Sequence, residues 1–306
     1  MPPVRAMLRS LWSFWRRGRT VERAGYSVGA LLLVSGVIHL AILIIGGYSW
    51  EGPLSLRKAA TFGLSFGLTL ISIVWVASFL RLGDRTRPVL LGAFTATCVV
   101  ETALVSLQAW RGVPSHFNVA TPFDASVART LAAGGVVLVA TIVILTAAAF
   151  RANPAVPVSL RVAIQIGFVA LCGAAGVGAL MIAKGMRLVF AGDPQSAYAT
   201  GGTFKPTHAV TMHAILVLPM LAWLLSFANW SERQRLGVVL LAAGGYIVVA
   251  AGVAMENFAG RTMGHMPVAL IALLAAGTFT FLAAGLMTLR AVARSSGPHG
   301  LQHGQP

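Results

Sequence analysis

Residues 56–81 read LRKAATFGLSFGLTLISIVWVASFLR, and residues 204–229 read FKPTHAVTMHAILVLPMLAWLLSFAN. After a basic start, each stretch continues through about 20 mainly apolar residues, the length that a helix needs to cross the hydrocarbon core of a bilayer. Similar runs recur along the chain, at about 26–48, 60–80, 89–110, 128–150, 161–183, 207–228, 236–255 and 266–289. We therefore expect an all-α polytopic membrane protein with eight transmembrane helices.

The composition supports this fold class. Hydrophobic residues make up 57% of the 306 residues and charged residues only 10%, with a mean hydropathy of +0.80. Soluble domains carry about 25% charged residues, so the composition excludes a soluble enzyme, a disordered chain and a disulfide scaffold. The net charge of +15 does not indicate a nucleic-acid partner, because the basic residues lie between apolar runs. The expected partner is the lipid bilayer.

The distribution of basic residues predicts the orientation in the membrane. With a cytoplasmic N-terminus, 15 of the 23 lysines and arginines fall on the cytoplasmic side, and the other 8 fall on the outer side. Positive residues are enriched in cytoplasmic segments, and an even number of spans returns the chain to its starting side. We expect a multi-pass protein of the cell membrane, plasma or inner, with both termini in the cytoplasm.

The chain divides into four parts on this reading. Residues 1–25 form a basic amphipathic segment in which Leu8, Leu11, Trp12 and Trp15 recur at helical spacing among arginines. This pattern is typical of an interfacial helix on an anionic leaflet, although a weakly ordered basic tail stays an alternative. Residues 26–152 and 153–294 would form two four-helix halves, and the polar residues 295–306 a disordered tail.

The two halves resemble each other weakly, which suggests a tandem repeat. The two stretches quoted above each begin near a lysine, Lys58 or Lys205, and end near Ser-Phe. The segments after the third and seventh runs each place an arginine four or five residues before a histidine, in WRGVPSHFNVATP and AGRTMGHMPVA. Four spans per half would give both halves the same orientation, with a pseudo-twofold axis along the membrane normal. Chance similarity of composition is the alternative.

Histidines gather on one side of the predicted membrane. Of the seven histidines, His299 and His303 lie in the tail; the other five fall in the outer half, and they are His39, His116, His208, His213 and His265. Ionisable residues inside a membrane are costly and are functional candidates by default. The i, i+5 spacing of His208 and His213 is poor for one small metal ion, and no CxxC or paired-carboxylate pattern accompanies it.

A b-type haem suits this set better than zinc or a di-iron centre. Haem needs one or two axial imidazoles, an apolar slot, and basic side chains for its propionates. We expect His213 or His265 to ligate the iron, and Arg111, Lys205 and Arg261 to be available to the carboxylates. For any single histidine, a helix cap or a hydrogen bond to a neighbouring carbonyl remains the competing interpretation.

Glu101 is the one carboxylate deep within a predicted span. Its depth resembles that of His39, so the two could form a pair that relays a proton, orients the imidazole or neutralises two buried polar groups. A neutral Glu101 bonded to a backbone carbonyl is the alternative.

Two outer loops are long for a tight bundle. They cover residues 111–127 and 185–206, and long loops are often functional or disordered. The apolar residues Phe117 and Phe123 favour a packed lid.

The span plan and the outer histidines together resemble the heme A synthase family. That resemblance implies eight spans in two four-helix halves, termini inside, and outer-side histidines that hold haem. On the half-to-half alignment, His116, His208 and His265 would occupy three of the four ligand places, whereas the fourth aligned position is Thr61. The cysteine pair that the family often carries in its first outer loop is missing here, which speaks against heme A synthesis itself.

Three functions therefore remain open. The first is a haem-binding protein of an oxidoreductase or electron-transfer kind. The second is a small-solute or proton-coupled transporter, in which Glu101 or His39 would couple protons. The third is an assembly or structural subunit that binds another membrane protein or a second copy of itself through faces of small residues.

Overall fold

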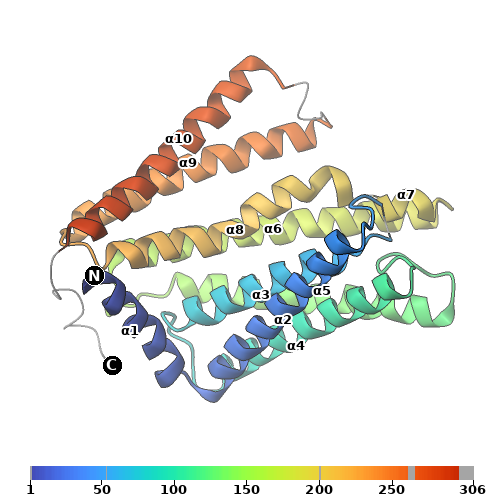
Figure 1. Ribbon diagram of the computed structural model, residues 1–306, viewed down its shortest axis with the longest axis horizontal. Coiled ribbons are helices and arrows are strands. Elements are labelled where there is room, and N and C mark those ends of the chain that lie inside the picture. Colours follow the sequence, from blue (N-terminus) through green and yellow to red (C-terminus); the bar gives the residue numbers. More distant parts are fainter. Residues whose placement is uncertain (1, 53, 200, 261–265, 296–306) are drawn as a thin grey trace.

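The computed structural model describes residues 2–52, 54–199, 201–260 and 266–295, and these form helices joined by short connections. Eight of the helices are long and apolar enough to cross a membrane, which confirms the expected fold class. In chain order the helices are α1 (Pro2–Arg17), α2 (Thr20–Ile45), α3 (Arg57–Ala77), α4 (Thr86–Trp110), α5 (Pro122–Ala149), α6 (Val158–Phe190), α7 (Pro194–Ala199), α8 (Gly201–Leu225), α9 (Glu232–Phe258) and α10 (Val268–Arg294). The long helices run roughly along one direction, as Figure 1 shows.

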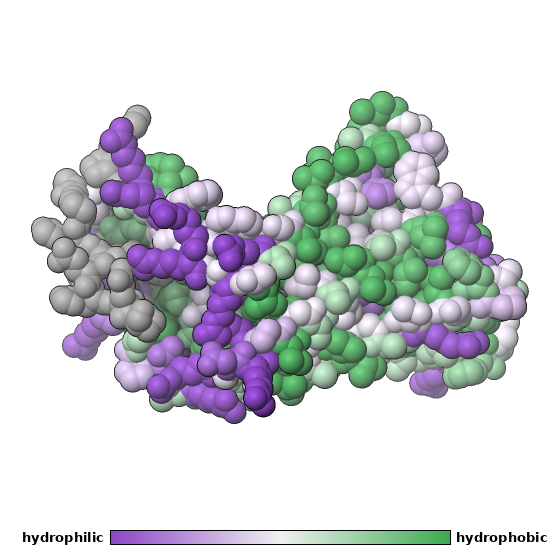
Figure 2. Space-filling model, turned by 90° about the horizontal axis from the view of Figure 1, so that it is seen from below, coloured by the Kyte–Doolittle hydropathy of each residue, from purple (hydrophilic) through white to green (hydrophobic). Residues whose placement is uncertain are grey.

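The surface has the banded character of a membrane protein. Figure 2 shows hydrophilic residues concentrated at the end that carries α1, a smaller hydrophilic group at the opposite end, and mainly hydrophobic surface between them. Large apolar side chains such as Phe279 on α10 and Leu31 on α2 are 75% and 67% exposed, respectively. Because such exposure is unfavourable in water, these faces are suited to contact with lipid.

Helix α1 packs across one end of the bundle, and the helix expected at the N-terminus is present. Met7 contacts the cluster of Ala228, Ala291 and Val292, and Phe14 packs edge-to-face with Trp75 at 6.2 Å. Figure 1 shows α1 at the same end as the last turns of α10. The other apolar stripe of α1 consists of Leu8, Leu11, Trp12 and Trp15 and is 37–60% exposed, and within it the ring of Trp15 also lies 6.4 Å from that of Tyr26 on α2.

Helix α2 begins at Thr20, about six residues before the expected start. The reason is a buried ion pair near its N-terminus: Arg87 of α4 donates from Nη1 to Glu22 at 3.0 Å, and both residues are only 7% exposed. Arg87 also donates to the carbonyls of Ala77 and Leu80, at 2.8 and 3.0 Å. The polar first turn therefore stays helical, because its charge is satisfied inside the protein.

Glycines allow the backbones of α2 and α3 to touch. A side chain added at Gly36 would collide with the backbone of Leu64, and one at Gly63 would collide with the backbone of Gly36. Gly29 and Gly67 make a similar approach further along the same interface. In lipid, where the hydrophobic effect does not drive helices together, such close contact supplies van der Waals stabilisation.

The closest helix pairs occupy corresponding places in the two halves. The α2–α3 and α6–α8 contacts are the most extensive in the protein, and they join the first two spans of each half. The halves meet partly where α3 contacts α8. The tandem repeat itself remains a prediction.

The second of the two expected outer loops is mostly helical, so that expectation was wrong for residues 185–206. Helix α6 continues to Phe190, α7 follows at Pro194–Ala199, and α8 begins at Gly201. The first of these two loops, expected at residues 111–127, is also shorter than expected, because α5 already begins at Pro122. Thr121 caps this helix by accepting a hydrogen bond from the backbone N–H of Asp124 at 3.1 Å.

Candidate functional site

Three basic side chains lie near one another at the N-terminal ends of α3 and α8. Lys58 is close enough to both Arg57 and Lys205 to be repelled by them, and Lys205 is also repelled by Arg57. Glu51 attracts Lys205. In the described part of the chain, however, no carboxylate lies within 4 Å of any of these three basic groups. We call Arg57, Lys58 and Lys205 the basic cluster.

The loop of residues 111–121 reaches from this cluster to α6. Phe117 has a left-handed backbone with φ of 63°, which is unusual for a bulky residue, and its ring lies directly against Gly185 of α6. The absence of a side chain at Gly185 makes room for that ring. Phe117 therefore packs as expected for a lid, whereas Phe123 is 51% exposed and lies under the guanidinium of Arg111 at 4.7 Å.

A buried carboxylate fastens both ends of this loop. Asp124 is 3% exposed and pairs with Arg111 at 2.6 Å, and it accepts hydrogen bonds from Gln108 and Thr121 at 2.8 and 2.7 Å. Arg111 in turn donates to Gln108. The expected role of Arg111 as a partner for a bound carboxylate is therefore weakened, because the structure uses its guanidinium to hold the loop.

His116 is the functional candidate that this loop positions. Its imidazole is partly buried beside the rings of Phe62 at 5.8 Å and Phe117 at 6.2 Å, and Nδ1 lies 3.0 Å from the hydroxyl of Ser115. Burial, with a smaller contribution from the positive charge of Lys58, lowers the pKa of His116 to about 4. The imidazole is therefore neutral at physiological pH, as a metal ligand must be.

The two described histidines of α8 are both anchored through Nδ1. His208 donates to the carbonyl of Ala174 on α6 at 2.8 Å, and His213 donates to the carbonyl of Ala209 at 2.6 Å. Because a carbonyl can only accept, Nδ1 carries the proton in each case and Nε2 keeps a lone pair. Ligand histidines typically have this anchoring, although it also serves ordinary histidines in helices.

His39 is held in a different way. Its Nδ1 donates to the carbonyl of Ser35 at 2.8 Å, and its Nε2 accepts from the indole of Trp110 at 3.0 Å. Both ring nitrogens are therefore engaged, so His39 is poorly placed to ligate a metal.

The structure does not support the expected pairing of His39 with Glu101. The carboxylate of Glu101 is only 4% exposed and lies against Gly134 of α5, where a side chain would collide with it. His39 instead bonds to Trp110, nine residues further along the same helix as Glu101. Two other predicted site residues, Arg261 and His265, lie outside the described residues.

Sequence reasoning missed the network that shapes this site. Asp124 and Gln108 belong to α5 and α4, and nothing in the spacing of the sequence joins them across the loop. The Thr-x-x-Asp pattern of Thr121 and Asp124 could have indicated the start of a helix. Phe62 lies within an apolar run, and its contact with His116 could not be predicted from the sequence because it depends on tertiary packing.

Comparisons with known proteins add no assignment: no protein family, curated protein or solved structure matches this chain.

Proposed function

We propose that the protein is a haem-binding integral membrane protein of an oxidoreductase or electron-transfer kind, with a b-type haem at the outer ends of α3 and α8. The observation that carries the proposal is the place of the neutral imidazole of His116 beside Phe62 and near Lys58, which belongs to the basic cluster. Haem requires this combination of an uncharged nitrogen ligand, an apolar surrounding and cations for its carboxylates.

The basic cluster supports binding of an anion with more than one negative charge. Like charges brought together in a partly buried place repel one another, and the repulsion grows as water is removed. Since no carboxylate of the described chain pairs with Arg57, Lys58 or Lys205, a bound anion would supply the missing charge. Each of the two haem propionates would pair with one lysine, since Lys58 lies on α3 and Lys205 on α8.

The surrounding side chains suit the rest of such a ligand. Phe62 and Phe66 lie 5.4 Å apart on α3, and Ser65 of the same helix faces Met212 of α8 at 3.7 Å. These groups give the α3–α8 contact a largely apolar character. Haem, when bound, supplies one-electron chemistry whose potential depends on its axial ligands and on burial.

The imidazoles available for the iron are those of His116, His208 and His213. Each has Nδ1 in a hydrogen bond, while no hydrogen bond of Nε2 is found within the described residues. The role of this chain is therefore to present an imidazole nitrogen, to hold His208 and His213 in the tautomer that leaves the lone pair on Nε2, and to exclude water through the 111–121 loop. His39 is left out of the ligand set, because both of its nitrogens are engaged.

The test is titration of the purified protein with hemin, with the Soret band as readout. Wild-type protein should bind hemin saturably and give a low-spin spectrum. His116, His208 and His213 are changed to Ala one at a time, and the spectrum should be lost or altered in each variant that lacks an iron ligand. His303→Ala is the control and should keep the wild-type spectrum. A spectrum that is unchanged in all three variants would refute the ligand assignment, and failure of wild-type protein to bind hemin would refute the proposal.

A second candidate is transport of a small organic anion, favoured by Pro206 and Pro219 inside α8. Proline removes a backbone hydrogen bond and can bend or break a helix, as in the discontinuous helices of transporters. Lys205 of the basic cluster lies near the start of the same helix, and the cluster would then bind the transported anion. Uptake of a small dicarboxylate into proteoliposomes, lost in Lys58→Gln but kept in His208→Ala, would favour transport over haem binding.

A further inference from the structure

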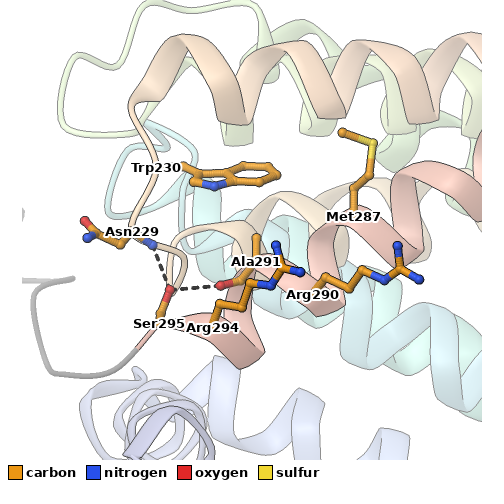
Figure 3. A pocket seen from close by; sticks show the side chains of 7 residues that line it. All are labelled: Asn229, Trp230, Met287, Arg290, Ala291, Arg294 and Ser295. Carbon is orange, nitrogen blue, oxygen red and sulfur yellow. Dashed lines mark hydrogen bonds between the residues drawn. The ribbon is translucent and has the colours of Figure 1, made fainter.

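At the end of the bundle that carries α1, a cavity of about 320 Å³ lies between the α8–α9 connection and the last turns of α10. Figure 3 shows the ring of Trp230 on one side, with Met287, Arg290 and Arg294 of α10 on the other. The remaining lining residues are Asn229, Ala291 and Ser295. This cavity lies near the C-terminal ends of α8 and α10, whereas the basic cluster lies at the N-terminal ends of α3 and α8.

The cavity is built from fixed backbone and carries two basic groups. Ser295 donates from its hydroxyl to the carbonyl of Ala291 at 2.9 Å and accepts from the backbone N–H of Asn229 at 2.9 Å, so the connection is joined to the end of α10. Arg290 and Arg294 are exposed and one turn apart on one face of the helix. Within the described chain neither guanidinium has a carboxylate within 4 Å.

The lining changes from basic to apolar along α10. Met287 lies one turn before Arg290 on the same face and is 42% exposed. Beside it, on the adjoining face of α10, Phe279, Leu282 and Leu286 are 75%, 61% and 47% exposed, as lipid-facing residues are. The ring of Trp230 is partly buried near the end of a span, a depth at which tryptophans concentrate in membrane proteins. A ligand that matches this lining has an anionic head and an apolar chain.

The adjacent surface of α1 has the same two-part character. Met7 and Trp230 both pack against the cluster of Ala228, Ala291 and Val292, which places α1 beside the cavity. Helix α1 exposes Leu8, Leu11, Trp12 and Trp15 among the arginines Arg5, Arg9, Arg16 and Arg17. A helix of this kind lies in the headgroup region of an anionic leaflet, so the cavity would open at the depth of phospholipid headgroups.

We propose that the cavity between Trp230 and α10 is a binding site for an anionic phospholipid. Its phosphate pairs with Arg290 and Arg294, and its glycerol and first chain methylenes contact Trp230 and Met287. A free phosphate would use the two arginines and would gain nothing from the apolar side of the cavity. The lipid therefore accounts for more of the lining than a soluble anion does.

The experiment measures lipid binding to the full-length protein in a neutral detergent, by native mass spectrometry. Phosphatidylglycerol is compared with phosphatidylcholine of identical chains. Each arginine near an anionic headgroup contributes about fivefold in affinity, so the double variant Arg290→Gln/Arg294→Gln should lose about 25-fold in affinity for phosphatidylglycerol. Its affinity for phosphatidylcholine should change little. Because both side chains are exposed, this variant should keep the wild-type helicity and elution volume, which are checked first.

A matched control removes two other charges from the same end. Arg151 and Arg233 are exposed and do not line the cavity, so Arg151→Gln/Arg233→Gln should keep the preference for phosphatidylglycerol. Trp230→Ala should weaken binding of both lipids, since it removes the apolar wall. Equal loss in both double variants would show a diffuse charge effect and overturn the site. Displacement of the lipid by millimolar inorganic phosphate would assign the arginines to a soluble anion instead and would also overturn the proposal.

Discussion

Replacing Arg87 should destabilise the protein more than replacing any exposed arginine. Its guanidinium donates three hydrogen bonds. One goes to Glu22 of α2, one to the carbonyl of Ala77 at the end of α3, and one to the carbonyl of Leu80 just beyond that helix. Both members of the ion pair are 7% exposed. Arg87→Met would leave the buried Glu22 carboxylate without its cationic partner and with only the hydrogen bond from the backbone N–H of Arg19, and loss of one member of a comparable buried pair costs about 3–5 kcal/mol.

The assay is unfolding in mixed micelles with increasing SDS, followed by circular dichroism. Glu22→Gln combined with Arg87→Met should cost less than the sum of the two single changes, because the double variant no longer contains an isolated buried charge. The control is Asp84→Asn, which removes a pair with Arg19 at 3.1 Å in which the Asp84 side chain is 93% exposed, and it should leave the midpoint essentially unchanged. A loss below about 1 kcal/mol for Arg87→Met, or strict additivity in the double variant, would refute this reasoning.

Three further predictions concern packing, pH and orientation. Gly63→Leu should separate α2 from α3, because its side chain would meet the backbone of Gly36, and it should lower the unfolding midpoint far more than Gly92→Leu, whose added Cβ has no neighbour within 4 Å. The free energy of unfolding should fall as pH decreases from about 6.5 towards 4, because His116 takes up a proton more readily in the unfolded chain than in the structure, where its pKa is about 4. His116→Gln should reduce the dependence of stability on pH over this range. Reporter fusions after residues 85 and 233 should be cytoplasmic and those after residues 116 and 195 external, and the reverse pattern would contradict the orientation inferred from the basic residues.

The number and nature of the helices were predictable from the sequence, whereas their ends were not. Apolar runs of span length are a local property, so each of the eight spans could be recognised. The start of α2 depends on a partner 65 residues away, since Glu22 is stable inside a helix only when Arg87 neutralises it. Hydropathy alone places such charged residues outside the span.

The candidate site was predictable in its residue types and only partly in its geometry. Lys205, His116 and His208 were expected on one side of the membrane, and the structure places them near the N-terminal ends of α3 and α8 or in the adjoining loop. The pairing of His39 with Trp110 could not be read from depth alone, because depth does not specify which face of a helix a residue occupies. The interactions of Asp124 with Gln108, Arg111 and Thr121 similarly depend on α4, the 111–121 loop and α5, which meet only after folding.

The most direct test of the central proposal is the dithionite-reduced minus oxidised absorption spectrum of the full-length protein, purified after expression with a haem precursor. A haem bound between α3 and α8 predicts sharp α and Soret bands, with both bands diminished in Lys58→Gln/Lys205→Gln protein of normal helicity. Colourless wild-type protein from haem-replete cells would contradict the proposal.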